Sequence, residues 1–407
     1  MIAELRGFDS AVWIRALGRF VNSIAYFIAR PFLVLYLYDQ MNVSLMVAAL
    51  VLAVSPLTQF AFGFLSGYLT DRYGRVTLMF WAQIIMATSF FGYVFSTSPW
   101  HFALFTVVNG IGGIMFGPAS NAHIADSVPE EKRLQVYSFL QTAFNLGTAI
   151  GPMLGVWLYT FNPSLVFTIS GVLQLIVGVI LLLFLPETLP KEKQVSGKRE
   201  KQVKQKLEPL KLREHKMLVY MTLLSVTAIL LYGQIETMLP LHLKDHFVNY
   251  AEVFALMMTT NAVVVICLQM WVSKRTEKMK LANLLLFSYV LFAMVSIGYG
   301  VASSLALLLI MELLFTIGEM ICFPHLNKAV AQLAPEEFRG RYFAIYGQQW
   351  PLGRMLAPLI GGAIMSVWDG TVLFFSLSVV LLISGLIWYK FLTPVTKKTE
   401  IEQQASL

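Results

Sequence analysis

The sequence predicts an all-α membrane protein with twelve transmembrane helices in two pseudo-symmetric six-helix bundles. Three observations support this fold class: an apolar composition, apolar segments of membrane-spanning length, and an internal repeat. Of 407 residues, 57% are hydrophobic and only 13% are charged, far from the composition of an ordinary soluble domain. A water-soluble fold could not bury this much apolar surface, so we exclude that class.

Apolar stretches of about 20 residues, long enough to cross a hydrocarbon core of about 30 Å, recur along the chain. They lie near 12–38, 44–70, 76–96, 100–126, 134–160, 165–186, 216–243, 249–273, 280–301, 305–332, 341–367 and 371–393. One long charged stretch divides them into six and six. The predicted parts are an N-terminal bundle (1–186), a cytoplasmic linker (187–214), a C-terminal bundle (215–395) and a cytoplasmic tail (396–407).

The basic residues predict the orientation, because loops rich in Lys and Arg stay on the cytoplasmic side. Every second loop is basic, and the alternate loops hold only Lys244. We therefore expect both termini on the cytoplasmic side of the plasma membrane, and the net charge of +7 reflects topology rather than nucleic-acid binding. The basic linker is expected to be a solvated tether. The first apolar stretch is too long for a signal peptide.

An internal repeat relates the two halves at a fixed offset of 206. It aligns Pro118 with Pro324, PEEKR at 129–133 with PEEFR at 335–339, and Pro152 with Pro358, where 358 minus 152 is 206. Duplicated bundles are common in transporters, which bind substrate near the membrane midplane at the repeat interface. The repeat therefore predicts two similar bundles facing each other across a central cavity.

The loop after the second span reads GYLTDRYGR. It resembles the loop signature of the major facilitator superfamily, G-x-L-x-D-R-x-G-R, and a plain basic turn is the alternative interpretation. The resemblance implies a gate latch between the bundles, in which Asp71 lies near the positive N-terminus of a helix in the second bundle. The matching gate residues are Gly67, Asp71, Arg72, Gly74 and Arg75, together with Leu69.

The fifth span contains GTAIGPMLG, which resembles the motif of the antiporter branch of that superfamily. Its matching residues are Gly147, Gly151, Pro152 and Gly155, whereas Val156 replaces a frequent second glycine. Small residues at this spacing allow close helix packing and Pro permits a bend, so packing alone is an alternative explanation. In the fourth span, Thr106 stands where drug and proton exchangers often carry an arginine.

Ionisable residues within the spans are the candidate coupling groups, because a charge in a bilayer costs at least about 2.5 to 3.5 kcal/mol. We expect Glu236 and Glu319 to exchange protons, with Arg30 as a partner of Glu236, although a static ion pair is the alternative. Glu312 lies nearer the outer end of its span and is interpreted as reaching toward the interface. Asp126 is expected to pair with Lys132 and Arg133 on the cytoplasmic side.

Aromatic and polar side chains at similar depth complete the predicted cavity. The candidate proton-coupling and cavity residues are Glu236, Glu319, Glu312, Arg30, Tyr26, Tyr232 and Gln234. The histidines have no metal-ligand spacing, and Cys267 and Cys322 both lie in apolar spans, so we expect no metal, cofactor or disulfide. No phosphate loop or nucleophile elbow is present, so we expect no enzymatic activity.

The resemblance, which covers the whole chain, points to the bacterial drug and proton antiporter family. It implies proton-coupled export of lipophilic, cationic drugs by alternating access, with a small lipophilic substrate, protons and the lipid bilayer as partners and a monomer as the working unit. The alternative is a symporter or uniporter of one defined metabolite, which needs a denser set of polar cavity residues. Candidates for such a set are Asn22, Gln59, Asn109, Asn145, Gln234, Asn261 and Gln348. A membrane scaffold without transport would not need the gate motif.

Overall fold

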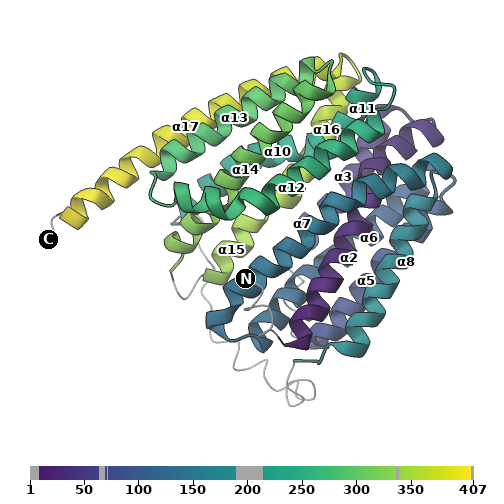
Figure 1. The fold of residues 1–407 in the computed structure, drawn as a ribbon, viewed down its shortest axis with the longest axis horizontal. Coiled ribbons are helices and arrows are strands. Elements are labelled where there is room, and N and C mark those ends of the chain that lie inside the picture. Colours follow the sequence, from purple (N-terminus) through teal and green to yellow (C-terminus); the bar gives the residue numbers. More distant parts are fainter. Residues whose placement is uncertain (1–8, 64–68, 71, 189–213, 336–338, 405–407) are drawn as a thin grey trace. The chain divides into compact units, whose positions relative to one another are not determined.

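The computed structural model describes residues 9–63, 69–70, 72–188, 214–335 and 339–404, and these residues form helices and short connections without a strand (Figure 1). The chain forms two compact units, Met1–Pro209 and Leu210–Leu407. We refer to them as the N-terminal and C-terminal units and describe each by itself.

The described residues of the N-terminal unit include six long helices and one π-helical turn. They are α2 (Ser10–Leu35), η1 (Tyr36–Gln40), α3 (Leu45–Phe62), α5 (Arg75–Val94), α6 (Pro99–Ser127), α7 (Glu130–Phe161) and α8 (Leu165–Phe184). Ser44 and Ser98 begin α3 and α6 by accepting hydrogen bonds from the main-chain N–H of Val47 and His101, as serine does at helix N-termini.

The C-terminal unit repeats this order with two interruptions. Its helices are α10 (Lys216–Thr237), α11 (Leu239–Lys244), α12 (Tyr250–Thr276), α13 (Leu281–Val301), α14 (Leu305–Leu333), α15 (Arg339–Gly347), α16 (Gln349–Met365) and α17 (Gly370–Gln404). Pro240 and Pro351 lie just after the two breaks, and neither has the N–H that would continue the preceding helix. Helix α17 continues through Gln404, into the segment predicted to be a tail.

The predicted fold class is confirmed, and the helices follow the predicted spans closely. Among the described residues, ten helices are long and apolar enough to cross a membrane. Helix α7 and the interrupted pair α15 and α16 occupy the two remaining predicted positions. The pair is divided at Gln348, and α7 begins with four charged residues at 130–133 and carries polar Gln141 and Asn145 along its length.

The internal repeat is visible in the packing of each unit. In the N-terminal unit α2 packs against α7, α3 against α6, and α5 against both α6 and α8. In the C-terminal unit α10 packs against α16, α12 against α14, and α13 against both α14 and α17. These four pairs correspond one to one under the shift of 206 residues, so the duplication seen in the sequence extends to the helix contacts.

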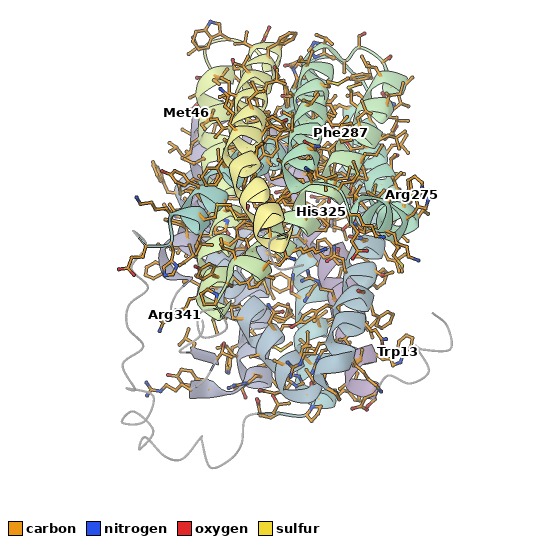
Figure 2. All side chains as sticks on the ribbon, turned by 90° about the vertical axis from the view of Figure 1, so that its left-hand side faces the viewer. Trp13, Met46, Arg275, Phe287, His325 and Arg341 are labelled. Carbon is orange, nitrogen blue, oxygen red and sulfur yellow. The ribbon has the colours of Figure 1, made fainter. Side chains whose placement is uncertain are left out.

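Large apolar side chains point away from the helices on the outer surface (Figure 2). Met46 and Phe287, both labelled there, are exposed, and so are many leucines, valines and tryptophans of the other spans. A soluble protein rarely exposes such continuous apolar surface. This surface fits a hydrocarbon environment, and the chain is a multi-pass membrane protein.

Candidate functional site

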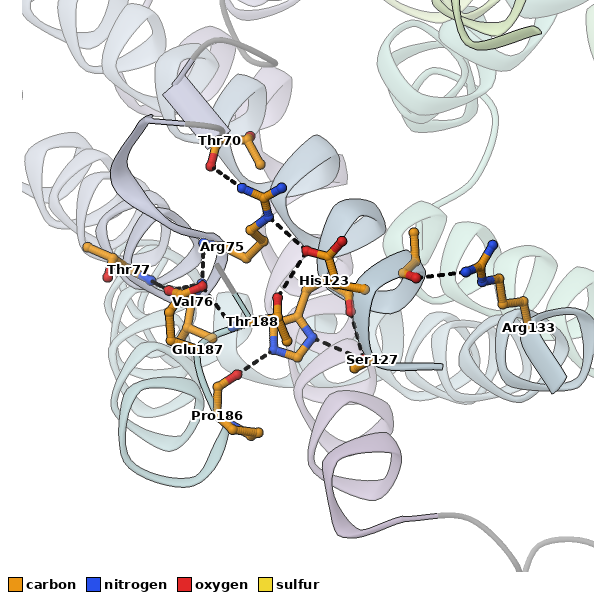
Figure 3. Close-up of polar contacts among 12 residues, drawn as sticks. Thr70, Arg75, Val76, Thr77, His123, Ser127, Arg133, Pro186, Glu187 and Thr188 are labelled. Atoms are coloured by element: carbon orange, nitrogen blue, oxygen red, sulfur yellow. Dashed lines mark hydrogen bonds and ion pairs between the residues drawn. The ribbon is translucent and has the colours of Figure 1, made fainter. Parts of the chain in front are cut away.

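Glu187 binds the N-terminus of α5 (Figure 3). Its carboxylate accepts hydrogen bonds from the main-chain N–H of Arg75 (2.9 Å), Val76 (3.0 Å) and Thr77 (3.3 Å). These are N–H groups that an α-helix leaves without a partner, and the helix dipole favours an anion beside them. Gly74 precedes them with φ +93°, and a Cβ there would lie 2.7 Å from Glu187 Oε2. The residue before α5 therefore has to be glycine.

Changing Glu187 to glutamine is expected to lower stability by up to about 1 kcal/mol, because the amide keeps a weaker acceptor but loses the charge at the helix N-terminus. The measurement is the midpoint of thermal unfolding in detergent micelles. Glu252→Gln is the matched control, since Glu252 lies in the first turn of α12 and is exposed. Equal shifts for both variants would show that Glu187 does not stabilise α5.

Arg75 connects the gate loop to the end of α6. Its Nε donates to Asp126 Oδ2 (3.0 Å) and its Nη1 donates to the Thr70 carbonyl (3.0 Å). Asp126 was predicted to pair with Lys132 and Arg133, and the predicted partners are wrong. Arg133 instead donates to the main-chain carbonyls of Ala125 and Val128, because it lies within reach of the carboxyl end of α6.

The structure describes only some of the other gate residues. Arg72 is exposed and lies over the ring of Tyr73, and Gly67 and Asp71 lie outside the described residues. The first two residues of the predicted linker, Glu187 and Thr188, are bound to α5 and α6 rather than solvated. The latch role of Asp71 stays a prediction.

The glycines of the antiporter-type motif face α2 along one side of α7. A Cβ at Gly147 would lie 2.6 Å from the Phe20 carbonyl, at Gly151 2.7 Å from Phe27 Cβ, and at Gly155 2.7 Å from the Ile28 carbonyl. In the C-terminal unit, Gly353 and Gly361 face Ile229 and Gln234 of α10 in the same way. Adding 206 to Gly147 and Gly155 gives these two positions. The motif packs two helices at close range in both units, and its link to antiport stays a prediction.

Substituting alanine for Gly147 is expected to cost about 1 to 3 kcal/mol, because a rigid carbonyl occupies the space of the new methyl group. Gly117→Ala in α6 is the control, since no heavy atom lies within 4 Å of a Cβ there and alanine favours a helix. Thermal unfolding in micelles compares the two. A tolerated Gly147→Ala would contradict the close packing of α2 and α7.

Glu236 and Arg354 form an ion pair within the C-terminal unit. Arg354 Nη2 donates to Glu236 Oε1 at 2.7 Å, and the side chains are 29% and 8% exposed. Glu236 lies at the end of α10 and Arg354 in α16, the pair of helices held together by the repeated glycine contacts. The sequence analysis singled out Glu236 but did not give it Arg354 as a partner. The suggested partnership of Arg30 with Glu236 joins residues of different units and stays a prediction.

Glu312 is completely enclosed between α13 and α14. Its side chain is 0% exposed, Tyr299 Oη donates to its Oε2 at 2.6 Å, and its Oε1 has no hydrogen-bond partner among the described residues. The prediction that Glu312 reaches for the interface is wrong, because the neighbouring helix covers it and Tyr299 supplies a donor. A carboxylate that accepts only one hydrogen bond is costly to bury in such surroundings. A protonated carboxyl group in the same place costs much less.

Glu319 lies two turns further along α14 and is half-buried. Asn261 of α12 donates from Nδ2 to Glu319 Oε2 (2.9 Å) and to Thr316 Oγ1 (2.9 Å). The Thr316 hydroxyl in turn donates to the main-chain carbonyl of Glu312 (2.7 Å). The Glu319 carboxylate and the Thr316 hydroxyl therefore share one neutral donor, Asn261.

Four aromatic rings lie beside Glu319 and Arg354. Tyr232 contacts Phe315, Phe323 and Trp350 with ring centroids 4.9, 5.6 and 5.6 Å apart, and Trp350 lies under the Arg354 guanidinium. Tyr232 also interacts with Glu319. We call these four rings the aromatic cluster. A rigid apolar surface next to a carboxylate is suited to a lipophilic cation.

The remaining predicted site residues are Arg30, Tyr26 and Gln234. Arg30 lies over the ring of Tyr26 on α2, and Gln234 is buried with its Nε2 donating to the Ala357 carbonyl at 2.7 Å. Sequence reasoning missed Trp350 and Tyr299. The signal for Trp350 was present, because it precedes the intramembrane Arg354 by one helical turn.

The helical units, their repeat and their buried carboxylates together define a membrane transporter. The Major Facilitator Superfamily model matches residues 15–347 and 251–406, and the chain belongs to this superfamily. An uncharacterised MFS-type transporter of Bacillus subtilis, YhjO, is 31% identical over 93% of this chain and 92% of its own. A Na(+), Li(+), K(+)/H(+) antiporter of Planococcus maritimus is 24% identical, with 90% and 92% covered.

Two further proteins are similar to this chain. Multidrug resistance protein MdtH of Klebsiella pneumoniae is 25% identical over 78% of this chain and 77% of its own. Among solved structures, a D-xylose-proton symporter superposes with a TM-score of 0.77 at 15% identity, covering 94% of this chain and 97% of that chain. The structural likeness supports the fold alone.

Proposed function

We propose that the chain exports lipophilic cationic compounds in exchange for protons, by alternating access. The observation that carries this proposal is the set of three carboxylates in the helices of the C-terminal unit, one of them beside the aromatic cluster. A carboxylate attracts an organic cation and a proton in turn, so that the arrival of one favours release of the other. We further propose that the chain lies in a bacterial inner membrane with both termini in the cytoplasm.

The three acids differ in what compensates their charge. Glu236 has a guanidinium partner at 2.7 Å, so a basic group of the chain itself pairs with it. Among the described residues, Glu312 and Glu319 have only hydroxyl and amide donors, so their charge depends on what else binds. We therefore assign proton exchange to Glu312 and Glu319 and a fixed charge pair to Glu236 and Arg354.

Exchange of alkali metal cations for protons is the second candidate. It is favoured by the likeness to the Planococcus maritimus antiporter and by the oxygen atoms of Glu319 and Thr316, which lie together because both accept from Asn261 Nδ2. Oxygen ligands of this kind suit hard cations. The two candidates use the same acids and differ in the ion that competes with the proton.

Proteoliposomes with an imposed proton gradient separate the two candidates. Gradient-driven movement of ethidium that Glu319→Gln abolishes would support drug export. Proton release on addition of Na⁺, Li⁺ or K⁺, without ethidium movement, would support alkali cation exchange. If correctly inserted protein moves neither, both candidates are wrong, and one defined metabolite becomes the better hypothesis.

A further inference from the structure

His242 is a buried histidine of the C-terminal unit that the proposed transport mechanism does not use. It lies in the short helix α11 and is only 2% exposed. Its Nε2 lies 3.2 Å from the main-chain carbonyl oxygen of Tyr299, in the last turn of α13. A carbonyl oxygen can only accept, so Nε2 carries the hydrogen and donates it. The His242 side chain therefore binds α11 to the part of α13 that carries Tyr299.

Helix α17 holds the His242 ring in this position. The ring centroid of Phe374 lies 5.7 Å from that of His242 and 6.0 Å from that of Tyr299. A Cβ at Gly370 would overlap His242 Nδ1, so the backbone of α17 lies directly against the imidazole. Ser296 Oγ of α13 donates to the Phe374 carbonyl at 2.7 Å. Three helices therefore meet at this corner and leave the imidazole little freedom to turn.

Tyr299 connects this corner to Glu312. Its side chain is 0% exposed, and its hydroxyl donates to Glu312 Oε2 at 2.6 Å. One residue is thus held at its carbonyl by His242 and presents its hydroxyl to the Glu312 carboxyl group. A hydrogen bond to a carboxylate is about twice as strong as one between neutral groups. This bond therefore favours the charged form of Glu312, to an extent that depends on where the Tyr299 hydroxyl is held.

We propose that His242 positions the Tyr299 hydroxyl on Glu312 and thereby sets the pH at which Glu312 takes up its proton. His242 acts through Tyr299 and is a positioning residue. The inference rests on the proposed function in assigning proton exchange to Glu312. Among the described residues, the titratable groups that interact with Glu312 are Tyr299, Glu319 and Tyr232, and those that interact with His242 are His246, Asp245 and Asp369.

The test follows the protonation of Glu312 in the purified protein, by infrared difference spectroscopy between samples at different pH. The absorption of the protonated Glu312 carboxyl group is identified by its loss in Glu312→Gln. Tyr299→Phe removes the donor, so the pH of half-protonation is expected to rise by about one to two units, the effect of one hydrogen bond to a charged group. His242→Leu is expected to raise it by less, because the hydroxyl remains but is no longer held in place.

Three further variants separate positioning from a merely structural role. If His242 acts through Tyr299, the double variant His242→Leu with Tyr299→Phe has the same pH of half-protonation as Tyr299→Phe alone. His242→Gln should restore the value of the unaltered protein, because an amide N–H can donate to the same carbonyl. His101→Leu is the control, since His101 is an exposed histidine of α6 in the other unit. If His242→Leu fails to fold, Gly370→Ala takes its place, because the added methyl group displaces the imidazole.

An unchanged or lowered pH of half-protonation in His242→Leu or Gly370→Ala, or shifts that add in the double variant, would overturn the positioning role. Transport in vesicles distinguishes this inference from the proposed function. If the unaltered protein moves neither ethidium nor protons while the half-protonation pH shifts as expected, the proposed function is wrong and the positioning role stands. If coupled transport is present and His242→Leu leaves the half-protonation pH unchanged, the positioning role alone is wrong.

Discussion

Changing Glu236 to glutamine is expected to destabilise the protein by about 3 kcal/mol and to abolish transport. The substitution leaves the Arg354 guanidinium without the carboxylate 2.7 Å away, and removing one partner of a buried ion pair costs about 3 to 5 kcal/mol. We expect the lower end of this range of energies because the Arg354 side chain is 29% exposed. Thermal unfolding in micelles and ethidium transport in vesicles measure the two effects.

The double variant Glu236→Gln with Arg354→Gln tests whether the pair acts as a unit. Removing both charges is expected to recover most of the lost stability, because no uncompensated charge remains. Transport should not recover, since the fixed charge pair would still be absent. If the two single losses simply add in the double variant, Glu236 and Arg354 do not stabilise each other.

Changing Glu312 to glutamine is expected to uncouple transport from the proton gradient without unfolding the protein. Glutamine has the shape of the protonated acid and still accepts a hydrogen bond from Tyr299, but it cannot release a proton. A gradient of one pH unit supplies a factor of about ten in accumulation for a one-to-one exchange. We expect this factor of ten in the unaltered protein and no accumulation in the variant.

Exchange of labelled substrate across vesicles without a gradient shows whether the Glu312→Gln variant still works. That exchange should persist, since it needs no net proton movement. Glu277→Gln is the control, because Glu277 is an exposed acid near Lys328. A Glu312→Gln variant with the full tenfold accumulation would exclude Glu312 as a coupling group.

The fold was predictable because membrane helices are dictated by local features of the sequence. Apolar length placed the helices within a few residues, and proline explains the breaks before Leu239 and Gln349, which the sequence analysis did not foresee. The repeat was also readable, and Gly147 and Gly353 occupy equivalent contacts in their units. Close contacts between helices require small residues, and these can be read directly from the sequence.

The pairing of charges was harder to predict, because it depends on contacts between distant parts of the chain. Glu236 and Arg354 are 118 residues apart, and the repeat pointed only to Arg30, whose partnership with Glu236 stays a prediction. Two residues that are equivalent under the repeat occupy similar places in their own units. This equivalence does not mean that the two residues are in contact. Glu312 was misplaced for a related reason: depth along one helix says nothing about a neighbouring helix that covers it.

The most direct test of proton-coupled export is the proton flux that substrate itself triggers. Proteoliposomes loaded with a pH-sensitive dye, and held without a pH gradient, receive a pulse of ethidium. We predict that the unaltered protein moves protons against the direction of ethidium and that Glu312→Gln and Glu319→Gln abolish this flux. Ethidium movement in the unaltered protein without any change of internal pH would contradict proton-coupled export.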